Sequence, residues 1–486
     1  MYYVGLDIGT SSLKTILIDE KKNILYENSY SYVIEEPQVG VREIDPDVWF
    51  QAAMRGLLAI TENYDTAELA VIGVTGQMHT TVFLDDQGLP CRKAIMWTDL
   101  RTVSMVEPLR EELLTYEETR HIAKILSPGC PAINALWVKN KEPEVFSRVR
   151  KIMTPHDYLV YRLSGHYSAD YCDASTSSLY DIQTKNWSSI MLKKLGIDEG
   201  YLGPLHASCD IVGTLRDEIK EQLKLSQDVR VIAGTGDNPA NAVAMGILDK
   251  QEPVISLGTS GVIIMPKEDG DFEGKGKNVL FSAKGTSFVN VVQGTVRSAG
   301  GTHKWWIENI VESSDMASDQ DRISESELGN NTILFFPHIT GDKIIYHDIE
   351  ARGAFLGLSA SSKRSDMTLA VLEGVSFALR EVLENMNLAT WPTHIQINGG
   401  GTKSALWMRI LASVLNSELE VVSNKATPSY GAALLAHRTD HSTDLEEEQA
   451  EQGILYTPDN ELVKAYDKQY QKYKRIYGAL HEIMQE

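Results

Sequence analysis

Three glycine-rich turns are the segments of this chain whose residue types are best suited to holding phosphate groups. They read DIGTSS (residues 7–12), SLGTSG (256–261) and NGGGTKS (398–404), and each follows a segment typical of a β-strand. Glycine lets backbone N–H groups approach phosphate oxygens closely, and adjacent hydroxyl groups add donors. None is a GxxxxGK[ST] loop or a GxGxxG turn that opens a helix, which disfavours a P-loop enzyme and a Rossmann dinucleotide site. Many strands end in glycine, so one such turn is weak evidence, but three favour a nucleotide site.

A single aspartate, Asp237, stands among small and apolar neighbours in IAGTGDNPANA (residues 232–242). A carboxylate placed there is suited to accept a proton from a reacting hydroxyl group. It is also suited to cap the helix that NPANAVAMG predicts. Taken alone, these residues favour the helix cap, so a role as general base depends on the rest of the chain.

A weak internal repeat predicts two related halves. LDIGTSSLKTIL begins at Leu6 and ISLGTSGVIIM begins at Ile255, and both read as strand, Gly-Thr-Ser turn and strand. Two copies of one hairpin suggest a duplicated unit with a cleft between the copies, although Gly-Thr-Ser can also recur by chance. The boundary is expected near residues 246–252. Where the first copy has Asp7 the second has Ser256, because a metal-linked carboxylate is needed only once.

Alternating patterns place these turns in an α/β chain. Residues 3–8, 13–18 and 24–30 predict an antiparallel meander, 68–76 a buried strand, and 46–64 a helix. Residues 460–484 predict one helix, and its stripe of tyrosines every three or four residues is expected to pack on its own domain. The acidic run at 444–451 is expected to be a solvated face or loop.

Composition excludes several classes of partner. The chain has 486 residues and a formal net charge of −21, which argues against binding nucleic acid or an anionic membrane. The cysteines form no CxxC pair, which argues against metal clusters and a disulfide framework. We expect a cytoplasmic protein, because the chain begins without a basic and apolar leader and has no run of 18 apolar residues. The four cysteines are Cys91, Cys130, Cys172 and Cys209.

The motifs together resemble those of the FGGY family of carbohydrate kinases, from residue 3 to about 436. The matching segments are GLDIGTSSLKTILID, GVTGQMHTTVFLDDQG, AIMWTDLRT, GTGDNPANAVAMG, ISLGTSG, ARGAFLGL, VLEGVSFALRE and INGGGTKSALWMRILASVLN. The resemblance implies a duplicated actin-like, ribonuclease-H-like fold with two domains around a central cleft. Residues 1–247 would bind the sugar and residues 248–486 would bind ATP. GQMH (76–79) and the W-x-D-x-R of residues 97–101 are most similar to members that phosphorylate D-xylulose.

The resemblance also implies a role for particular residues. Asp237 would be the general base, and Asp7 and Asp237 would hold Mg²⁺, with Asp7 acting through water. The implied ATP contacts are Thr10, Ser11, Ser12, Gly258, Thr259, Gly400, Gly401 and Ser404. The implied sugar contacts are Met78, His79, Asp99, Arg101, Asp237 and Asn238. Asp99 and Arg101 could equally pair with each other, and any one of the glycine turns could be purely structural.

Departures from the family pattern keep other functions open. Thr80 follows QMH where glycine is usual, Asn134 stands where lysine is common, and residues 341–347 read GDKIIYH in place of G-E-R-x-P. The alternatives are therefore a gluconate, ribulose or other polyol kinase. From another class, an actin-like nucleotide-switching structural or regulatory protein is the alternative. Homodimers occur in the family, but no interface can be read from this sequence.

Overall fold

The computed structural model describes residues 1–246, 252–267, 275–282, 288–342, 344–422, 427–441 and 453–485. The expected boundary between residues 247 and 248, and the acidic run at 444–451, lie outside these ranges. Within them, no helix is both long enough and apolar enough to span a membrane. All four cysteines are free thiols.

The N-terminal half is built on a seven-stranded sheet that contains the predicted meander. Antiparallel β1, β2 and β3 form one side, and β6 and β15 continue the sheet parallel to β1. The strands at 3–8, 13–18, 24–30 and 68–76 are thereby confirmed within a residue or two. In sheet order the strands are β14 (Ile211–Thr214), β15 (Arg230–Ile232), β6 (Leu69–Gly76), β1 (Tyr2–Ile8), β2 (Ser12–Asp19) and β3 (Ile24–Ser31), with β16 (Thr235–Gly236) paired to β6.

The C-terminal half repeats this topology. Its antiparallel strands β17, β18 and β20 correspond to β1, β2 and β3, and its parallel strands β23 and β24 correspond to β6 and β15. The repeated Gly-Thr-Ser hairpin therefore marks two copies of one fold, as predicted. In sheet order the strands are β19 (Lys277–Phe281), β20 (Val289–Val296), β18 (Gly261–Lys267), β17 (Val254–Leu257), β23 (His394–Asn398), β24 (Glu418–Val421) and β25 (Ile454–Tyr456).

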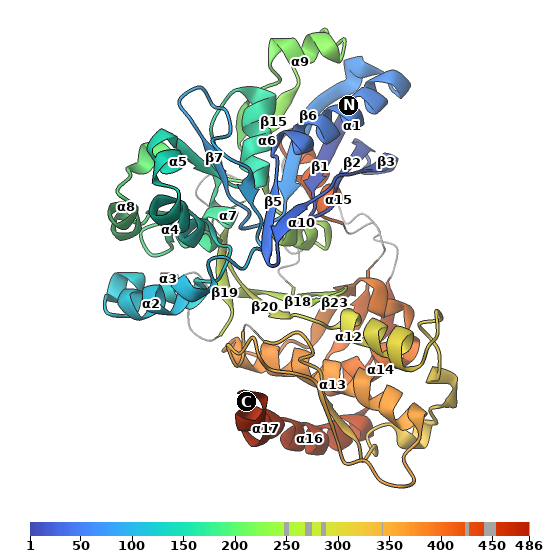
Figure 1. Ribbon diagram of the computed structural model, residues 1–486. Coiled ribbons are helices and arrows are strands. Elements are labelled where there is room, and N and C mark those ends of the chain that lie inside the picture. Colours follow the sequence, from blue (N-terminus) through green and yellow to red (C-terminus); the bar gives the residue numbers. More distant parts are fainter. Residues whose placement is uncertain are drawn as a thin grey trace.

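Helices cover both faces of each sheet, and shorter strands complete both halves (Figure 1). The helices are α1 (Asp47–Asn63), α2 (Val103–Leu114), α3 (Arg120–Ile125), α4 (Pro131–Lys141), α5 (Pro143–Arg148), α6 (Pro155–Ser164), α7 (Tyr171–Thr176), α8 (Ser189–Leu195), α9 (Asp217–Gln222), α10 (Asp237–Ala244), α12 (Gly300–Trp305), α13 (Arg364–Asn385), α14 (Ala405–Leu415), α15 (Pro428–His437), α16 (Asn460–Tyr473) and α17 (Ile476–Gln485). The shorter strands are β4 (Glu35–Gln38), β5 (Val41–Ile44), β7 (Val82–Leu84), β8 (Ala94–Ile95), β9 (Lys151–Met153), β10 (Ala169–Asp170), β11 (Tyr180–Asp181), β12 (Asn186–Trp187), β13 (Leu205–His206), β21 (Leu334–Phe336) and β22 (Ala354–Leu356).

The alternation of side chains along β1 divides the N-terminal core into two layers. Val4, Leu6 and Ile8 lie in the core that includes α1 and α6, whereas Tyr3 lies in the core that includes α15. Side chains two residues apart share a face of a strand. Asp7 therefore lies on the same face as Tyr3, the face that α10 and α15 cover.

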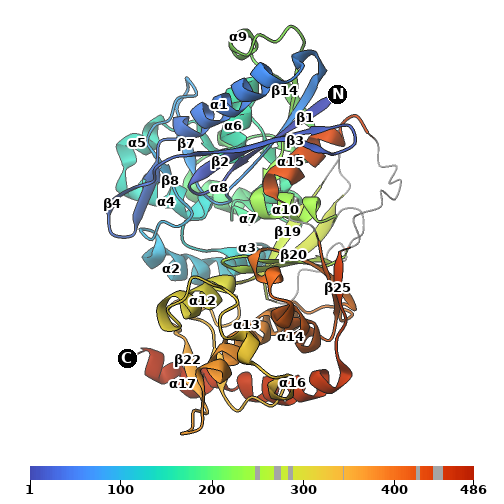
Figure 2. The same ribbon diagram turned by 90° about the vertical axis from the view of Figure 1, so that its right-hand side faces the viewer.

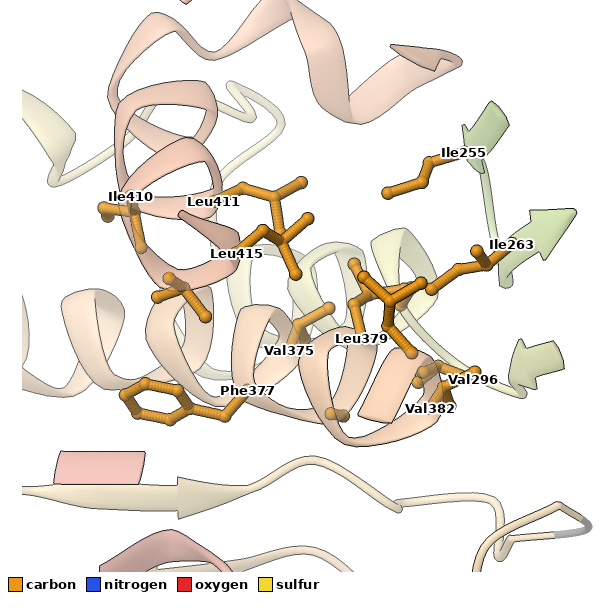
Figure 3. Close-up of a cluster of buried hydrophobic side chains, with 14 of the residues drawn as sticks. Ile255, Ile263, Val296, Val375, Phe377, Leu379, Val382, Ile410, Leu411 and Leu415 are labelled. Atoms are coloured by element: carbon orange, nitrogen blue, oxygen red, sulfur yellow. The ribbon is translucent and has the colours of Figure 1, made fainter. Parts of the chain in front are cut away.

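The C-terminal half is held by a continuous core beneath its sheet. Figure 3 shows side chains of α13 and α14 directed toward those of β17 and β18, among them Leu379 and Leu411 opposite Ile255 and Ile263. All four are fully buried. Burial of apolar side chains at this density is the main contribution that fixes α14 and the glycine turn before it.

Helix α15 belongs to the C-terminal half of the sequence but packs on the N-terminal sheet. Figures 1 and 2 both place it beside β1, away from α13 and α14. It touches β1 where Gly5 meets Ser429, and it touches α10 where Gly431 meets Ala240. The two halves are thus interleaved at α10 and α15, so a single cut in the sequence does not separate them in space.

The C-terminal tail is two helices, α16 and α17, and not the single helix that its tyrosine stripe predicts. Tyr466, Tyr470 and Tyr473 are fully buried in the core of the C-terminal half, so the expected packing is confirmed. The break at residues 474–475 turns α17. Tyr477 then stacks on Tyr346, with ring centroids 3.9 Å apart.

The close crossing of α10 and α15 makes Gly431 essential to the fold. A Cβ atom added there would lie 1.8 Å from the carbonyl oxygen of Ala240, whereas one added at Gly478 in α17 would meet nothing. We predict that Gly431→Ala lowers the free energy of unfolding by about 1–3 kcal/mol through overpacking. Gly478→Ala is the control and should leave it unchanged or slightly higher. Calorimetric melting temperatures would test this, and equal values for Gly431→Ala and wild type would contradict it.

Candidate active site

The parallel strands of the N-terminal sheet bring Asp7 and Asp237 to one edge. β1 pairs with β6, which pairs with β16, so that Ile8, Gly76 and Gly236 lie side by side. Asp7 comes one residue before Ile8 in β1. Asp237 comes one residue after Gly236 and is the first residue of α10. Ligands of α/β sheets commonly bind at the carboxyl ends of parallel strands, and this is such an edge.

Both carboxyl groups are shifted toward the neutral form. Burial raises the pKa of Asp7 to about 7, although Lys14 opposes the shift. Burial and then the charge of Asp7 raise the pKa of Asp237 to about 7, against the N–H of Asn238 and the charge of His156. Asp7 Oδ1 is buried and has no hydrogen-bond partner among the residues that the structure describes. A pKa near neutrality suits a group that takes up a proton during catalysis.

Asp237 accepts one helix N–H without being the cap that the sequence suggested. The N-cap of α10 is Gly236, which provides no side-chain hydrogen bond. Asp237 Oδ1 accepts the N–H of Asn238 at 2.7 Å, and Asp237 itself is half-buried on the wall of a cavity. Its carboxylate thus keeps acceptor capacity for a ligand in that cavity.

The cavity lies where residues from both halves meet. Its volume is about 430 Å³, which is within the range of small-molecule sites. Its walls come from α10, from β17 and the turn after β23, and from the start of α15. The lining residues are Asp237, Asn238, Asn241, Ser256, Asn398, Gly399, Gly400, Lys403, Thr427 and Pro428.

The predicted ATP-binding turns reach this region to different degrees. Gly400 lines the cavity, and a Cβ atom there would meet nothing within 4 Å. Gly401 instead packs against Leu257, and Ser404 caps α14, where its Oγ accepts the N–H of Trp407. The hydroxyl of Ser404 donates to Gln320 at 2.6 Å, so both of its hydrogen-bonding roles are used within the chain.

The two Gly-Thr-Ser turns are built alike but supported differently. In the first, Thr10 Oγ1 accepts the indole N–H of Trp97 at 3.2 Å, Ser11 is exposed, and Ser12 begins β2. In the second, the carbonyl oxygens of Gly258 and Thr259 accept N–H groups at the start of α12. Each turn is therefore fixed by other parts of the chain before any ligand binds.

The predicted sugar residues Met78, His79 and Asn238 lie together beside Asp237. Asn238 Nδ2 is 4.0 Å from Met78 Sδ. A Cβ atom at Gly236 would lie 2.6 Å from Met78 Cγ, so glycine there permits the close approach of the Met78 loop. His79 has a positive φ of 73°, a strained conformation for a histidine. Such strain is often found where a side chain must be aimed at a ligand.

Thr80 and Asn134, the departures from the family pattern, both hold this loop. Thr80 Oγ1 accepts the backbone N–H of Trp97 at 3.0 Å. Asn134 Nδ2 donates to Thr81 Oγ1 and to the Gly129 carbonyl oxygen, each at 2.9 Å. The side chains of Thr80, Thr81 and Asn134 are fully buried. Their hydrogen bonds fix the backbone of the loop that carries His79.

Asp99 and Arg101 pair with each other, the second of the two alternatives for them. Arg101 donates from Nε and Nη2 to the two carboxylate oxygens of Asp99 at 2.9 and 2.8 Å. Arg101 Nη2 also lies 2.8 Å from Glu43, and the N–H of Arg42 donates to Asp99 at 2.6 Å. Both oxygens of Asp99 are therefore used, and a sugar contact by this pair stays a prediction.

A buried histidine with three carboxylates lies behind the site, and sequence reasoning missed it. His156 Nε2 is 3.2 Å from both Asp157 and Asp170, and His156 Nδ1 is 3.3 Å from Asp173. Burial opposes its charge, but the three carboxylates raise the pKa of His156 well above its usual value. The pattern gave no signal, because these residues are spread over 18 positions of a segment that otherwise reads as helix and loop.

The residues fit a magnesium ion held mainly by other ligands. Asp7 has a buried carboxylate oxygen without a partner, and it faces the charge of Asp237. Within the described residues, no group of three or more His, Cys, Asp or Glu side chains forms a metal cage. Mg²⁺ commonly binds one or two carboxylates and completes its shell with water and substrate phosphates.

Family models match nearly the whole chain. The model of the N-terminal domain of the FGGY family of carbohydrate kinases matches residues 2–244, and that of its C-terminal domain matches 254–439. The chain belongs to this family. It is a carbohydrate kinase, with the duplicated actin-like fold that the sequence predicted.

Relatives of the same family extend along the full length. A xylulose kinase of Staphylococcus xylosus is 30% identical over 482 residues, 99% of this chain and 100% of that protein. A xylulose kinase of Lactococcus lactis is 32% identical over 496 residues, 99% of this chain and 97% of that protein. The crystal structure of a xyloylose kinase from Brucella ovis superposes with a TM-score of 0.89 at 29% identity, covering 99% of this chain and 100% of that one.

The buried charge of Asp7 should cost stability. Folded Asp7 and Asp237 hold protons up to about pH 7, but unfolded aspartate only to about pH 4, so stability contributed by protonation is lost as the pH rises between these values. We predict that Asp7→Asn raises the melting temperature at pH 8 more than at pH 5, without nucleotide or divalent cation.

Asp19, at the far end of β2, provides the control for Asp7. Its pKa is lowered by hydrogen bonds from Asn23 in spite of partial burial. Asp19→Asn should therefore lower the melting temperature at pH 8 or leave it unchanged. A destabilised Asp7→Asn variant at pH 8 would show that the Asp7 carboxylate is satisfied in the folded chain.

The Asp99–Arg101 pair allows its two proposed roles to be separated. Asp99→Asn removes one charge of a buried pair and should lower the free energy of unfolding by about 1–3 kcal/mol. If the pair is structural, KM for the sugar should change less than about twofold. A large rise in KM with an unchanged melting temperature would instead assign the pair to sugar binding.

Proposed function

We propose that the chain transfers the γ-phosphoryl group of ATP to the terminal hydroxyl of a pentulose, D-xylulose, with Asp237 as general base. One observation carries the proposal: a carboxyl group with a pKa near 7 lies on the cavity wall, next to the Asn238–Met78–His79 group. The full-length likeness to xylulose kinases supports this choice of acceptor.

In phosphoryl transfer the protein mainly positions the reactants and stabilises charge, and it forms no covalent bond to them. As the terminal oxygen of the sugar bonds to the γ-phosphorus, the bond from that phosphorus to the β–γ bridging oxygen breaks, and Asp237 accepts the hydroxyl proton. Its pKa of about 7 allows the anion to be present at neutral pH and makes proton transfer favourable. Asn238 and the Met78–His79 pair would hold the sugar so that its hydroxyl faces Asp237.

ATP is proposed to bind across the cavity, on the glycine turns. Gly400 leaves open space at the wall formed by the C-terminal half, and Lys403 adds a cation there. The Gly-Thr-Ser turns at Thr10 and Gly258 would face the phosphates. Asp7, with Asp237, would hold Mg²⁺, which would supply positive charge to offset that of the phosphates.

A panel of acceptors tests the proposed function. ADP release would be measured with Mg-ATP and D-xylulose, D-ribulose, L-ribulose, L-xylulose, gluconate, glycerol or erythritol. The proposal expects D-xylulose to have the highest kcat/KM. Preference for gluconate or ribulose would keep the kinase and replace its acceptor. ATP turnover that no sugar changes, or nucleotide-dependent polymerisation, would favour the structural or regulatory alternative.

Asp237→Asn tests the base. The amide keeps the size of the side chain but cannot accept the proton, so we predict that kcat falls by about 10²–10⁴-fold. The dissociation constant for ATP measured without Mg²⁺ should stay within about threefold, because Asp237 is assigned to the sugar hydroxyl and to Mg²⁺ and not to the adenosine. Fluorescence or calorimetric titration with ATP is the control. A variant with near-normal kcat would remove Asp237 from the role of base.

A further inference from the structure

Lys277 belongs to the C-terminal half, but its ammonium group lies beside the proposed sugar-binding loop of the N-terminal half. It is the first residue of β19, and its Nζ lies 3.2 Å from Nε2 of His79. An ammonium group has no lone pair, so it donates and Nε2 of His79 accepts. The contact joins residues 198 positions apart in the sequence.

Strand β19 is docked firmly enough to hold Lys277 there. The N–H of Leu280 donates to Ser175 Oγ in α7 at 3.0 Å, and Ser282 accepts the N–H of Ser208 at 2.8 Å. Leu280 is fully buried in an apolar cluster whose other buried members all come from the N-terminal half. The position of the ammonium is thus set by the packing of β19 and not by the His79 contact alone.

The ammonium group has more donors than the described residues satisfy. It has three N–H bonds, and among those residues its hydrogen-bond contact is with the ring of His79. Burial lowers the pKa of Lys277, and the charge of Asp173 only partly opposes that shift. A partly desolvated cation with unused donors is costly unless a ligand provides oxygen acceptors.

We propose that Lys277 is a specificity-determining residue that donates to the terminal oxygen of the acceptor at the end opposite the phosphorylated hydroxyl. The inference rests on the proposed function. Asp237 holds the reacting end, Asn238 and Met78 follow, and His79 and Lys277 come next along this line of contacts. For a pentulose phosphorylated at C5, the oxygen at Lys277 is the C1 hydroxyl.

The proposal gives the C-terminal half a part in sugar recognition. The other proposed sugar contacts, Met78, His79 and Asn238, precede residue 247, whereas Lys277 belongs to the second sheet. A sugar that contacts both His79 and Lys277 would therefore bind both halves at once. Occupancy of the sugar site would then favour the relative position of the halves in which the ATP-binding turns face Asp237.

The test compares two acceptors that differ only at C1. D-xylulose has the C1 hydroxyl and 1-deoxy-D-xylulose lacks it. Lys277→Met should raise KM for D-xylulose at least about tenfold, with kcat within about threefold of wild type, because a charge-assisted hydrogen bond is lost. For 1-deoxy-D-xylulose the same variant should differ from wild type by less than about twofold. The ratio between the acceptors does not depend on how much of the variant is folded.

Lys275→Met is the matched control. Lys275 is an exposed lysine two residues earlier, and its Nζ donates to the carbonyl oxygen of Ile345 within the C-terminal half. Its substitution should leave both KM values unchanged. An equal penalty on both acceptors in Lys277→Met, or no penalty on either, would overturn the C1 contact while leaving a wild-type rate on D-xylulose as support for the proposed function. A wild type inert on both pentuloses would overturn both proposals.

Discussion

The site depends on an electrostatic conflict between two carboxyl groups that the fold holds near each other. Burial raises the pKa of both Asp7 and Asp237 to about 7, the charge of Asp7 adds to the shift of Asp237, and one oxygen of Asp7 has no hydrogen-bond partner among the described residues. Neither effect stabilises the folded state. On the proposed function, both make the pair receptive to the proton and the cation that accompany phosphoryl transfer, so the ligands would supply the interactions that the described residues leave unmade.

The architecture can maintain this conflict because the backbone around it is rigid. Three adjacent strands fix the level of both aspartates, and α10 is held against α15 by contact at Gly431 that leaves no room for a side chain. Behind them, the charge of His156 lowers the pKa of Asp237, whereas Asp173 of the same cluster raises it. The cluster thus acts on the charge of Asp237 without lining the cavity.

Much of the fold could be predicted from local pattern, and the site only in part. Strand alternation and the repeated hairpin are local signals, and they predicted the meander, the duplication and the glycine-rich turns that we propose bind phosphate. The tail was predicted as one helix because a tyrosine stripe continues past its break, where stacking on Tyr346 decides the direction of α17. Asp99 and Arg101 could be identified as charged neighbours, but only the fold showed that each satisfies the other.

Contacts between segments that are far apart in the sequence could not be predicted from the sequence pattern. Lys277 lies in a stretch with no motif, and its place beside His79 follows from how β19 docks on α7. Helix α15 likewise reads as an ordinary C-terminal helix, yet it covers β1. Both depend on packing between the halves, for which no short-range periodicity exists.

The duplication also explains why the two halves are not alike where they meet the cavity. Ser256 occupies in β17 the place of Asp7 in β1: each precedes a Gly-Thr-Ser turn by two residues and pairs with the first parallel strand beside it. Ser256 lines the cavity together with Asp237. An aspartate at this position would place another negative charge against the base and, on the proposed function, against the phosphates of ATP. That added repulsion would oppose binding of the phosphates. The fold of the first half can therefore be repeated in the second half, but the carboxylate of Asp7 cannot be repeated at position 256.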